Sequence, residues 1–155
     1  MKKRVLSLLL ISVCLLTLIG CGKKEEETNK EESIKIEYDG VNITPGEKLK
    51  IDKISKDYDK SEVPDCAFGG KGIIYTFDDL EISTNEDDLI YSVYFIDPNM
   101  KTLEGISLGD SFDSVKEKYK GTESDGVYKY SKGKVEIDFT INGDIVSSIE
   151  YLLVD

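Results

Sequence analysis

Val135-Glu-Ile-Asp-Phe-Thr-Ile-Asn-Gly-Asp-Ile-Val-Ser-Ser-Ile149 is the stretch that decides the fold. Its first residues alternate between apolar and polar side chains. This period places Val135, Ile137 and Phe139 on one face of a β-strand and the polar residues on the other. Asn142-Gly143 follows, and this dipeptide is strongly favoured in two-residue hairpin turns. The stretch therefore predicts two antiparallel strands with one apolar face and one solvated face.

The same order of short patterns occurs earlier in the chain and predicts an internal repeat. The earlier set is Tyr75-Thr-Phe77, Leu80-Glu-Ile82 and residues 88–93, and the later set is Tyr128-Lys-Tyr130, Val135-Glu-Ile137 and residues 144–149. Chance recurrence is the alternative, because alternation is common in sheet proteins. The halves are approximately residues 41–96 and 105–154, within one domain that spans residues 34–155.

Each half is also expected to begin with a helix. Thr44-Pro45-Gly46-Glu47 matches a capping box with proline at the first helical position, and Ile51, Ile54 and Tyr58 follow at helical spacing. A second helix is expected to begin near Asp110 or Ser111. These patterns predict an α+β fold, in which two tandem helix-then-three-strand units share an antiparallel sheet with the helices on one face.

A family resemblance supports this expectation. The segment Gly105-Ile-Ser-Leu-Gly-Asp-Ser-Phe-Asp-Ser-Val-Lys-Glu-Lys-Tyr119, with the later Tyr-x-Tyr strand and Asp144-Ile-Val-Ser-Ser-Ile149, resembles the helix-plus-sheet module of the BamE (SmpA/OmlA) lipoproteins. In duplicate it is similar to β-lactamase-inhibitor-protein-like folds. Cys66-Ala-Phe-Gly-Gly with Tyr75-Thr-Phe77 also resembles small lipoproteins of Gram-positive bacteria. The resemblance implies a non-catalytic, membrane-anchored scaffold or binding protein.

The N-terminal region predicts a lipoprotein signal peptide over residues 1–20. Lys2, Lys3 and Arg4 precede an apolar run of 15 residues, 5–19, and the end of this run forms a lipobox with the next two residues, Leu18-Ile-Gly-Cys21. The run is shorter than the roughly 20 residues of a membrane-spanning helix, although an uncleaved span is the alternative. Cleavage after Gly20 would leave Cys21 to carry a diacylglyceryl group.

The mature chain is therefore expected to be held on the extracytoplasmic face of the cell membrane. Two acyl chains on Cys21, palmitate among them, are sufficient for stable anchoring. The lipidated cysteine and the polar residues after it, 21–33, predict a disordered tether because they contain no large apolar side chain.

Composition argues against nucleic-acid binding and against catalysis. Residues 1–20 hold three basic and no acidic residues, so cleavage changes the formal charge from −11 to −14. Arg4 is the only arginine, and the chain has no histidine or tryptophan. Nucleic acid is therefore an improbable partner. Cys66 is the remaining nucleophile candidate, but it has no histidine to activate it, so we expect no enzyme and no cofactor.

No metal site is assigned from the sequence. Asp57, Asp59, Ser61, Glu62 and Asp65 superficially resemble a calcium loop. Counting from Asp57, however, position 6 is Glu62 and position 12 is Phe68, where an EF-hand needs Gly and Glu. Weak divalent-cation binding stays open as part of an alternative function, a small-molecule or cation sensor.

The strand predicted over residues 89–96 gives the best candidate for a binding surface. Alternation places Ile90, Tyr94 and Ile96 on the face away from the expected helices. Either this face is exposed and binds a partner, or the strand is central and packed on both sides. The sequence thus predicts a lipid-anchored binding or protein-interaction module with an unidentified protein or cell-envelope partner.

Overall fold

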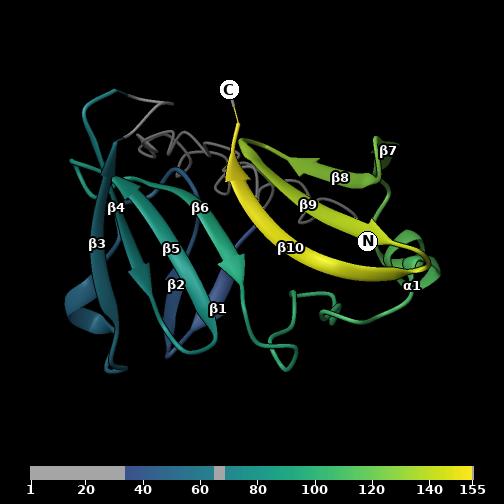
Figure 1. Cartoon of the computed structure of the whole chain (residues 1–155), viewed down its shortest axis with the longest axis horizontal. Helices are drawn as coiled ribbons and strands as arrows, with labels where there is room; N and C mark the ends of the chain where they lie inside the picture. The colour runs from purple at the N-terminus through teal and green to yellow at the C-terminus, as the bar shows by residue number, and fades with distance from the viewer. Residues whose placement is uncertain (1–33, 65–68, 155) are drawn as a thin grey trace, which may run out of the picture.

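The computed structural model describes residues 34–64 and 69–154 of the chain. This part contains ten strands, one α-helix and one 3-10 helix (Figure 1). In chain order they are β1 (Ile36–Tyr38), β2 (Val41–Ile43), η1 (Ile51–Lys53), β3 (Asp59–Pro64), β4 (Lys71–Thr76), β5 (Leu80–Asn85), β6 (Ile90–Phe95), α1 (Phe112–Lys118), β7 (Thr122–Ser124), β8 (Val127–Lys132), β9 (Val135–Asn142) and β10 (Ile145–Leu153).

Two four-stranded meanders join into one antiparallel sheet. The strand order is β3-β4-β5-β6-β10-β9-β8-β7, so the last strand of each meander pairs with the last strand of the other. Tyr94 lies opposite Glu150 at this junction, and Val93 lies opposite Tyr151. The segments that repeat in the sequence occupy matching strands, which are β4 and β8, β5 and β9, and β6 and β10.

The β9–β10 hairpin forms as its alternation and its Asn-Gly turn predict. Val135, Ile137 and Phe139 are at most 1% exposed, and Gly143 adopts the positive φ of 65° that the turn requires. Asp39-Gly40 forms a second such hairpin between β1 and β2, with φ values of 49° and 74°. These two hairpins are local features that short sequence patterns determine.

The predicted α+β class is wrong. The described residues are mostly β, with a two-stranded sheet, an eight-stranded sheet and a single short α-helix. Each half contributes four strands to the large sheet instead of the expected three. The second expected helix is present as α1, where the Ser111 side chain accepts a hydrogen bond from the Ser114 N–H and caps the helix.

The first expected helix does not form because its backbone pairs with another strand. Gly46 N–H donates to the Ile90 carbonyl at 2.8 Å, and Ile90 N–H donates to the Glu47 carbonyl at 2.9 Å. Gly46 also has a φ of 90°, which lies outside the helical region. Only the 3-10 turn η1 remains of the predicted helix, and Tyr58 at the end of the expected stripe is 42% exposed.

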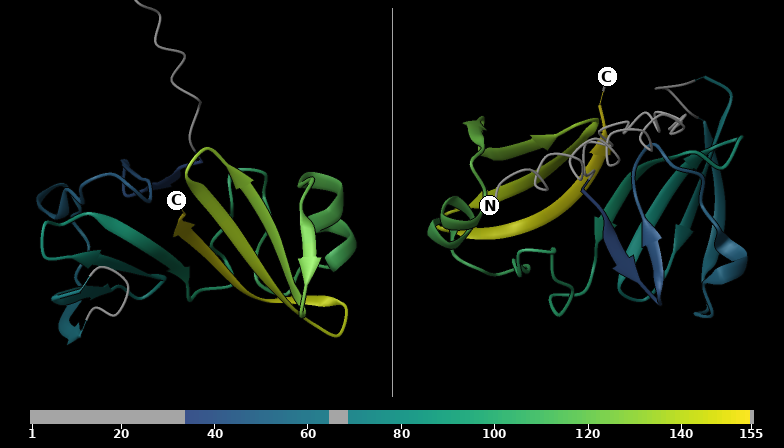
Figure 2. Two further views of the ribbon diagram at one scale, coloured as in Figure 1. Left: turned by 90° about the horizontal axis from the view of Figure 1, so that it is seen from above. Right: turned by 180° about the vertical axis from the view of Figure 1, so that it is seen from behind.

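Hydrophobic cover lies on one face of the sheet, called here the inner face. The hairpin of β1 and β2 covers the first meander, and α1 covers the second, as the view from behind shows (Figure 2). Tyr38 contacts Phe77 with ring centroids 5.3 Å apart, and Tyr119 contacts Phe139 at 5.0 Å. The opposite face, called here the outer face, is turned toward the viewer in Figure 1.

Candidate functional site on the outer face

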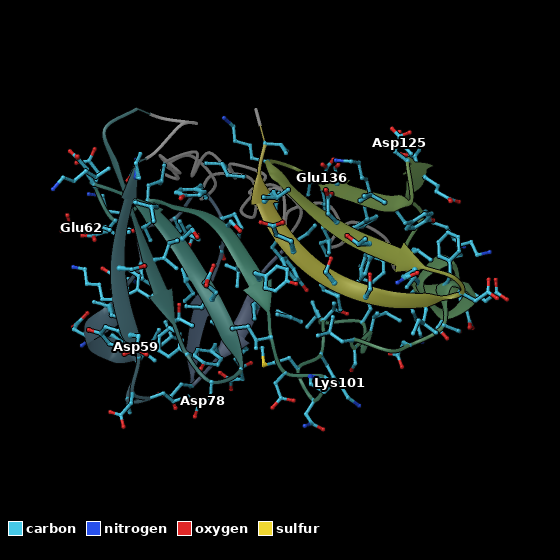
Figure 3. All side chains as sticks on the ribbon, in the orientation of Figure 1. Asp59, Glu62, Asp78, Lys101, Asp125 and Glu136 are labelled. Atoms are coloured by element: carbon cyan, nitrogen blue, oxygen red, sulfur yellow. The ribbon has the colours of Figure 1, made fainter. Side chains whose placement is uncertain are left out.

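A row of mostly charged and polar residues crosses the outer face from one meander to the other. Cross-strand pairing aligns one residue from each of seven strands, so that neighbours in the row have Cβ atoms about 5 Å apart. In order they are Asp59, Thr76, Glu81, Tyr94, Glu150, Asp138 and Lys129. We call this set the acidic row. Figure 3 views this face with Asp59 of β3 and Glu136 of β9 labelled.

Tyr94 lies at the centre of the acidic row and is its only aromatic residue. Its side chain is 38% exposed, and Ile96, two positions further along the chain, is 41% exposed. Glu81 lies opposite Tyr94 on β5, and Glu150 lies opposite it on β10. The exposed ring is therefore flanked on both sides by carboxylates.

Hydroxyl groups hold these two carboxylates in place. Thr76 Oγ1 donates to Glu81 Oε2 at 3.2 Å, and Ser92 Oγ donates to Glu150 Oε1 at 2.6 Å. Within the described ranges neither Glu81 nor Glu150 forms an ion pair with a lysine. Their negative charges are therefore oriented but not neutralised.

At the β8 end of the acidic row, Lys129 neutralises part of the negative charge of the neighbouring carboxylates. Its Nζ donates to Glu136 Oε1 at 2.9 Å and to Asp138 Oδ2 at 3.1 Å, and Ser131 Oγ also donates to Glu136. The hydrogen bond from Lys129 lowers the pKa of Glu136. Burial raises the pKa of Asp138, and the neighbouring carboxylate of Glu136 adds to this effect.

The predicted surface residues Tyr94 and Ile96 are exposed, but Ile90 is not. Ile90 is 1% exposed because β6 carries a bulge at Tyr91 and Ser92. Ser92 lies opposite Ser83, whereas Ile90 lies opposite Thr84, so the extra residue reverses the alternation. Ile90 thus belongs to the hydrophobic core on the inner face, and its assignment to the binding surface is wrong.

A separate hollow lies at the β1–β2 hairpin and the segment that leads to η1. It has a volume of about 520 Å3, and Lys48, Lys50 and Lys53 line it together with Asp39, Gly40, Val41, Asn42 and Glu47. Leu49 and Ile54 are buried and alternate with the exposed lysines, which explains why the ammonium groups point outward. Three lysines make this hollow a better site for an anion than for a divalent cation.

Several predicted features lie outside the described residues: the signal peptide, Gly20, Cys21, the tether and Cys66. Within residues 34–64 and 69–154, no cluster of three acidic or cysteine side chains could hold a metal ion. The same ranges contain no helix long and apolar enough to span a membrane.

The acidic row could not be predicted from the sequence because it depends on the register between strands. Alternation correctly places Glu136 and Asp138 away from the core. Placing Glu150 beside Tyr94, however, requires the pairing of β6 with β10, two strands far apart in the sequence. A search for acidic residues at outward positions of strands near Tyr94 would have found Glu81 as a candidate, but not its neighbour on β10.

No protein-family model matches the chain, and comparisons with curated proteins and with solved structures found no significant match.

Proposed function

We propose that the protein is a lipid-anchored, extracytoplasmic interaction module that binds a protein partner through the outer face and has no catalytic role. One observation carries the proposal. Tyr94 and Ile96 remain exposed on a face whose centre combines an aromatic ring with oriented carboxylates, while the hydrophobic core of both meanders lies on the other face. Exposed aromatic side chains of this kind are enriched at binding surfaces.

The membrane attachment in this proposal rests on Leu18-Ile-Gly-Cys21. We expect mass spectrometry of the native protein to find residues 1–20 absent and Cys21 acylated. The variant Cys21→Ser should be released from membranes or accumulate as an unprocessed precursor. An unmodified Cys21, or an intact leader on the membrane-bound protein, would refute the anchoring part of the proposal.

Site-specific crosslinking tests the interaction part of the proposal. A photoreactive amino acid at Tyr94, in the full chain on living cells, should yield one adduct, identified by mass spectrometry. The matched control is Leu103, which is 73% exposed and lies in the loop before α1. An adduct at position 94 and none at position 103 supports the proposal. Equal labelling at both positions, or none at position 94, contradicts it.

The lysine-lined hollow supports a second candidate function, the binding of a small anionic molecule. The side-chain ammonium groups of Lys48 and Lys50 make no hydrogen bond or ion pair within the described ranges, so their charges are available to a ligand. Titration with inorganic phosphate should shift the amide resonances of residues 47–53 in the wild-type chain. The shifts should disappear in Lys48→Gln/Lys50→Gln, and their persistence there would exclude the hollow as the site.

A further inference from the structure

We infer that the outer face binds a cationic segment of the partner protein, with a lysine or arginine side chain placed on the Tyr94 ring between Glu81 and Glu150. This inference rests on the proposed function and adds the chemistry of the partner. Its central feature is that both neighbours of Tyr94 in the acidic row are carboxylates.

The two carboxylates lack a cation of their own. Several other acidic groups of the described part are paired with lysine: Glu136 and Asp138 with Lys129, Glu62 with Lys71, Asp79 with Lys56 and Asp113 with Lys116. Glu81 and Glu150 instead accept hydrogen bonds from neutral hydroxyl groups. These bonds orient the carboxylates and leave their charge for an external partner.

The aromatic ring between them favours the same ligand. A lysine ammonium or an arginine guanidinium is attracted to the face of a tyrosine ring, and carboxylates at the ring edge add to the attraction. The ring is 38% exposed, so a side chain from another molecule can reach it. The formal charge of −11 for the whole chain also favours association with a cationic partner.

The spacing argues against a metal ion as the occupant. Glu81 and Glu150 belong to strands on opposite sides of β6, and strands two apart are separated by about 9.5 Å. A divalent ion needs several oxygen ligands at about 2.0–2.6 Å, and Tyr94 stands between these two carboxylates. A long cationic side chain that lies along the ring satisfies this spacing without chelation.

The acidic row also suggests how a longer segment would lie. Asp59 continues the row beyond Thr76 on one side, and on the other side Asp138, which is paired with Lys129, follows Glu150 before Lys129 ends the row on β8. An extended segment that crosses the strands would present every second side chain to the row. The partner is therefore expected to carry basic residues at alternating positions.

The test uses the full chain in detergent and, as the probe, an amidated peptide with four Lys-Ser repeats and a fluorescent label at its N-terminus. Fluorescence anisotropy at low salt compares wild type with Tyr94→Leu and with Glu81→Gln/Glu150→Gln. The matched control is Glu117→Gln/Glu123→Gln, which removes two exposed carboxylates from α1 and β7. Chemical denaturation of each variant checks that it is folded.

We expect Tyr94→Leu to weaken peptide binding about three-fold, as loss of an exposed cation–π contact would. The Glu81→Gln/Glu150→Gln variant should weaken it about five-fold or more, and the control less than two-fold. Equal losses of affinity in the control and in Glu81→Gln/Glu150→Gln would mean that the peptide responds only to the net charge of the protein. That result would overturn the inference. So would an unchanged affinity in Tyr94→Leu or an absence of binding to the wild type.

The cellular interaction through the outer face and the cationic chemistry of the partner are tested separately. A crosslinked partner at position 94 whose binding is insensitive to salt and to Glu81→Gln/Glu150→Gln would leave the interaction module in place and refute the cationic partner. Absence of any adduct at position 94, together with specific peptide binding, would refute the cellular function while the chemistry of the face stands.

Discussion

Two buried tyrosines of the second meander differ in what their hydroxyl groups contact. Tyr128 Oη donates to the Tyr119 carbonyl at 2.9 Å and accepts from Gly121 N–H at 2.9 Å. Tyr151 is fully buried, and its hydroxyl has no hydrogen-bond partner among the described residues. A buried hydroxyl without a partner is destabilising, whereas a satisfied one supports the groups that it bonds.

Truncation to phenylalanine should therefore have different effects at these two positions. Tyr128→Phe leaves Gly121 N–H without its acceptor and should lower the free energy of unfolding by about 1–3 kcal/mol. Tyr151→Phe should leave it unchanged or raise it by up to about 1 kcal/mol. Urea denaturation measures both. Equal losses would mean that the Tyr151 hydroxyl has a partner that this structure does not describe.

The carboxyl pair beside Lys129 predicts two opposite dependences on pH. Burial raises the pKa of Asp138, so ionising this group opposes folding, and the penalty grows as the pH rises through its folded pKa. Asp138→Asn should therefore match or exceed the stability of wild type at pH 7, by up to about 1 kcal/mol, and the gain should shrink toward pH 4.

Glu136→Gln is the matched control for that prediction. Because Lys129 lowers the pKa of Glu136, the ionised carboxylate stabilises the folded state above the unfolded pKa. Its loss should destabilise the protein at neutral pH, with a difference from wild type that fades as the pH falls through the folded pKa. The same pH trend for both variants would contradict the assignment of the two carboxyl groups.

At the scale of elements, the β1–β2 hairpin is fastened to the first meander through Asp79 in the β4–β5 turn. Tyr38 Oη donates to Asp79 Oδ1, and Lys56 Nζ donates to Oδ2 at 2.5 Å while it lies 4.4 Å from the Tyr38 ring centroid. Burial alone would raise the pKa of Asp79, but the bonds from Lys56 and Tyr38 outweigh it and lower the pKa.

Asp79→Asn should loosen this attachment. We expect it to lower the free energy of unfolding by about 1–3 kcal/mol at pH 7, and to speed hydrogen exchange in β1 and β2. The difference should disappear in acid, as wild type protonates below the normal carboxyl pKa of about 4. Asp78→Asn, at the exposed adjacent position, is the control and should be neutral. Equal effects at both positions would exclude the proposed attachment.

The elements that the sequence predicted well are those that local chemistry determines. The β9–β10 hairpin follows from alternation and Asn142-Gly143, and α1 follows from the Ser111 cap and the buried Val115. The first helix was predicted wrongly because Pro45 and Gly46 suit a turn as well as a capping box. The strand that begins at Ile90 competes for the same backbone groups.

At the scale of the whole molecule, what the sequence could not predict is the pairing of distant strands. The two meanders join where β6 pairs with β10, and this pairing brings Glu150 beside Tyr94. No local sequence pattern determines that register. The bulge in β6 also cannot be predicted from alternation, because alternation assumes a regular strand. The candidate site could therefore be located to one strand from the sequence, but its charged neighbours could not.

The central claim is that the outer face around Tyr94 serves binding, whereas the inner face holds the fold together. The most direct test compares the free energies of unfolding of Tyr94→Ser and Ile54→Ala by urea denaturation. Ile54 is 7% exposed, so its truncation leaves a cavity and should cost about 1–4 kcal/mol in a single transition. Tyr94→Ser should cost less than about 1 kcal/mol. If Tyr94→Ser costs as much as Ile54→Ala, the outer face is part of the core and the claim fails.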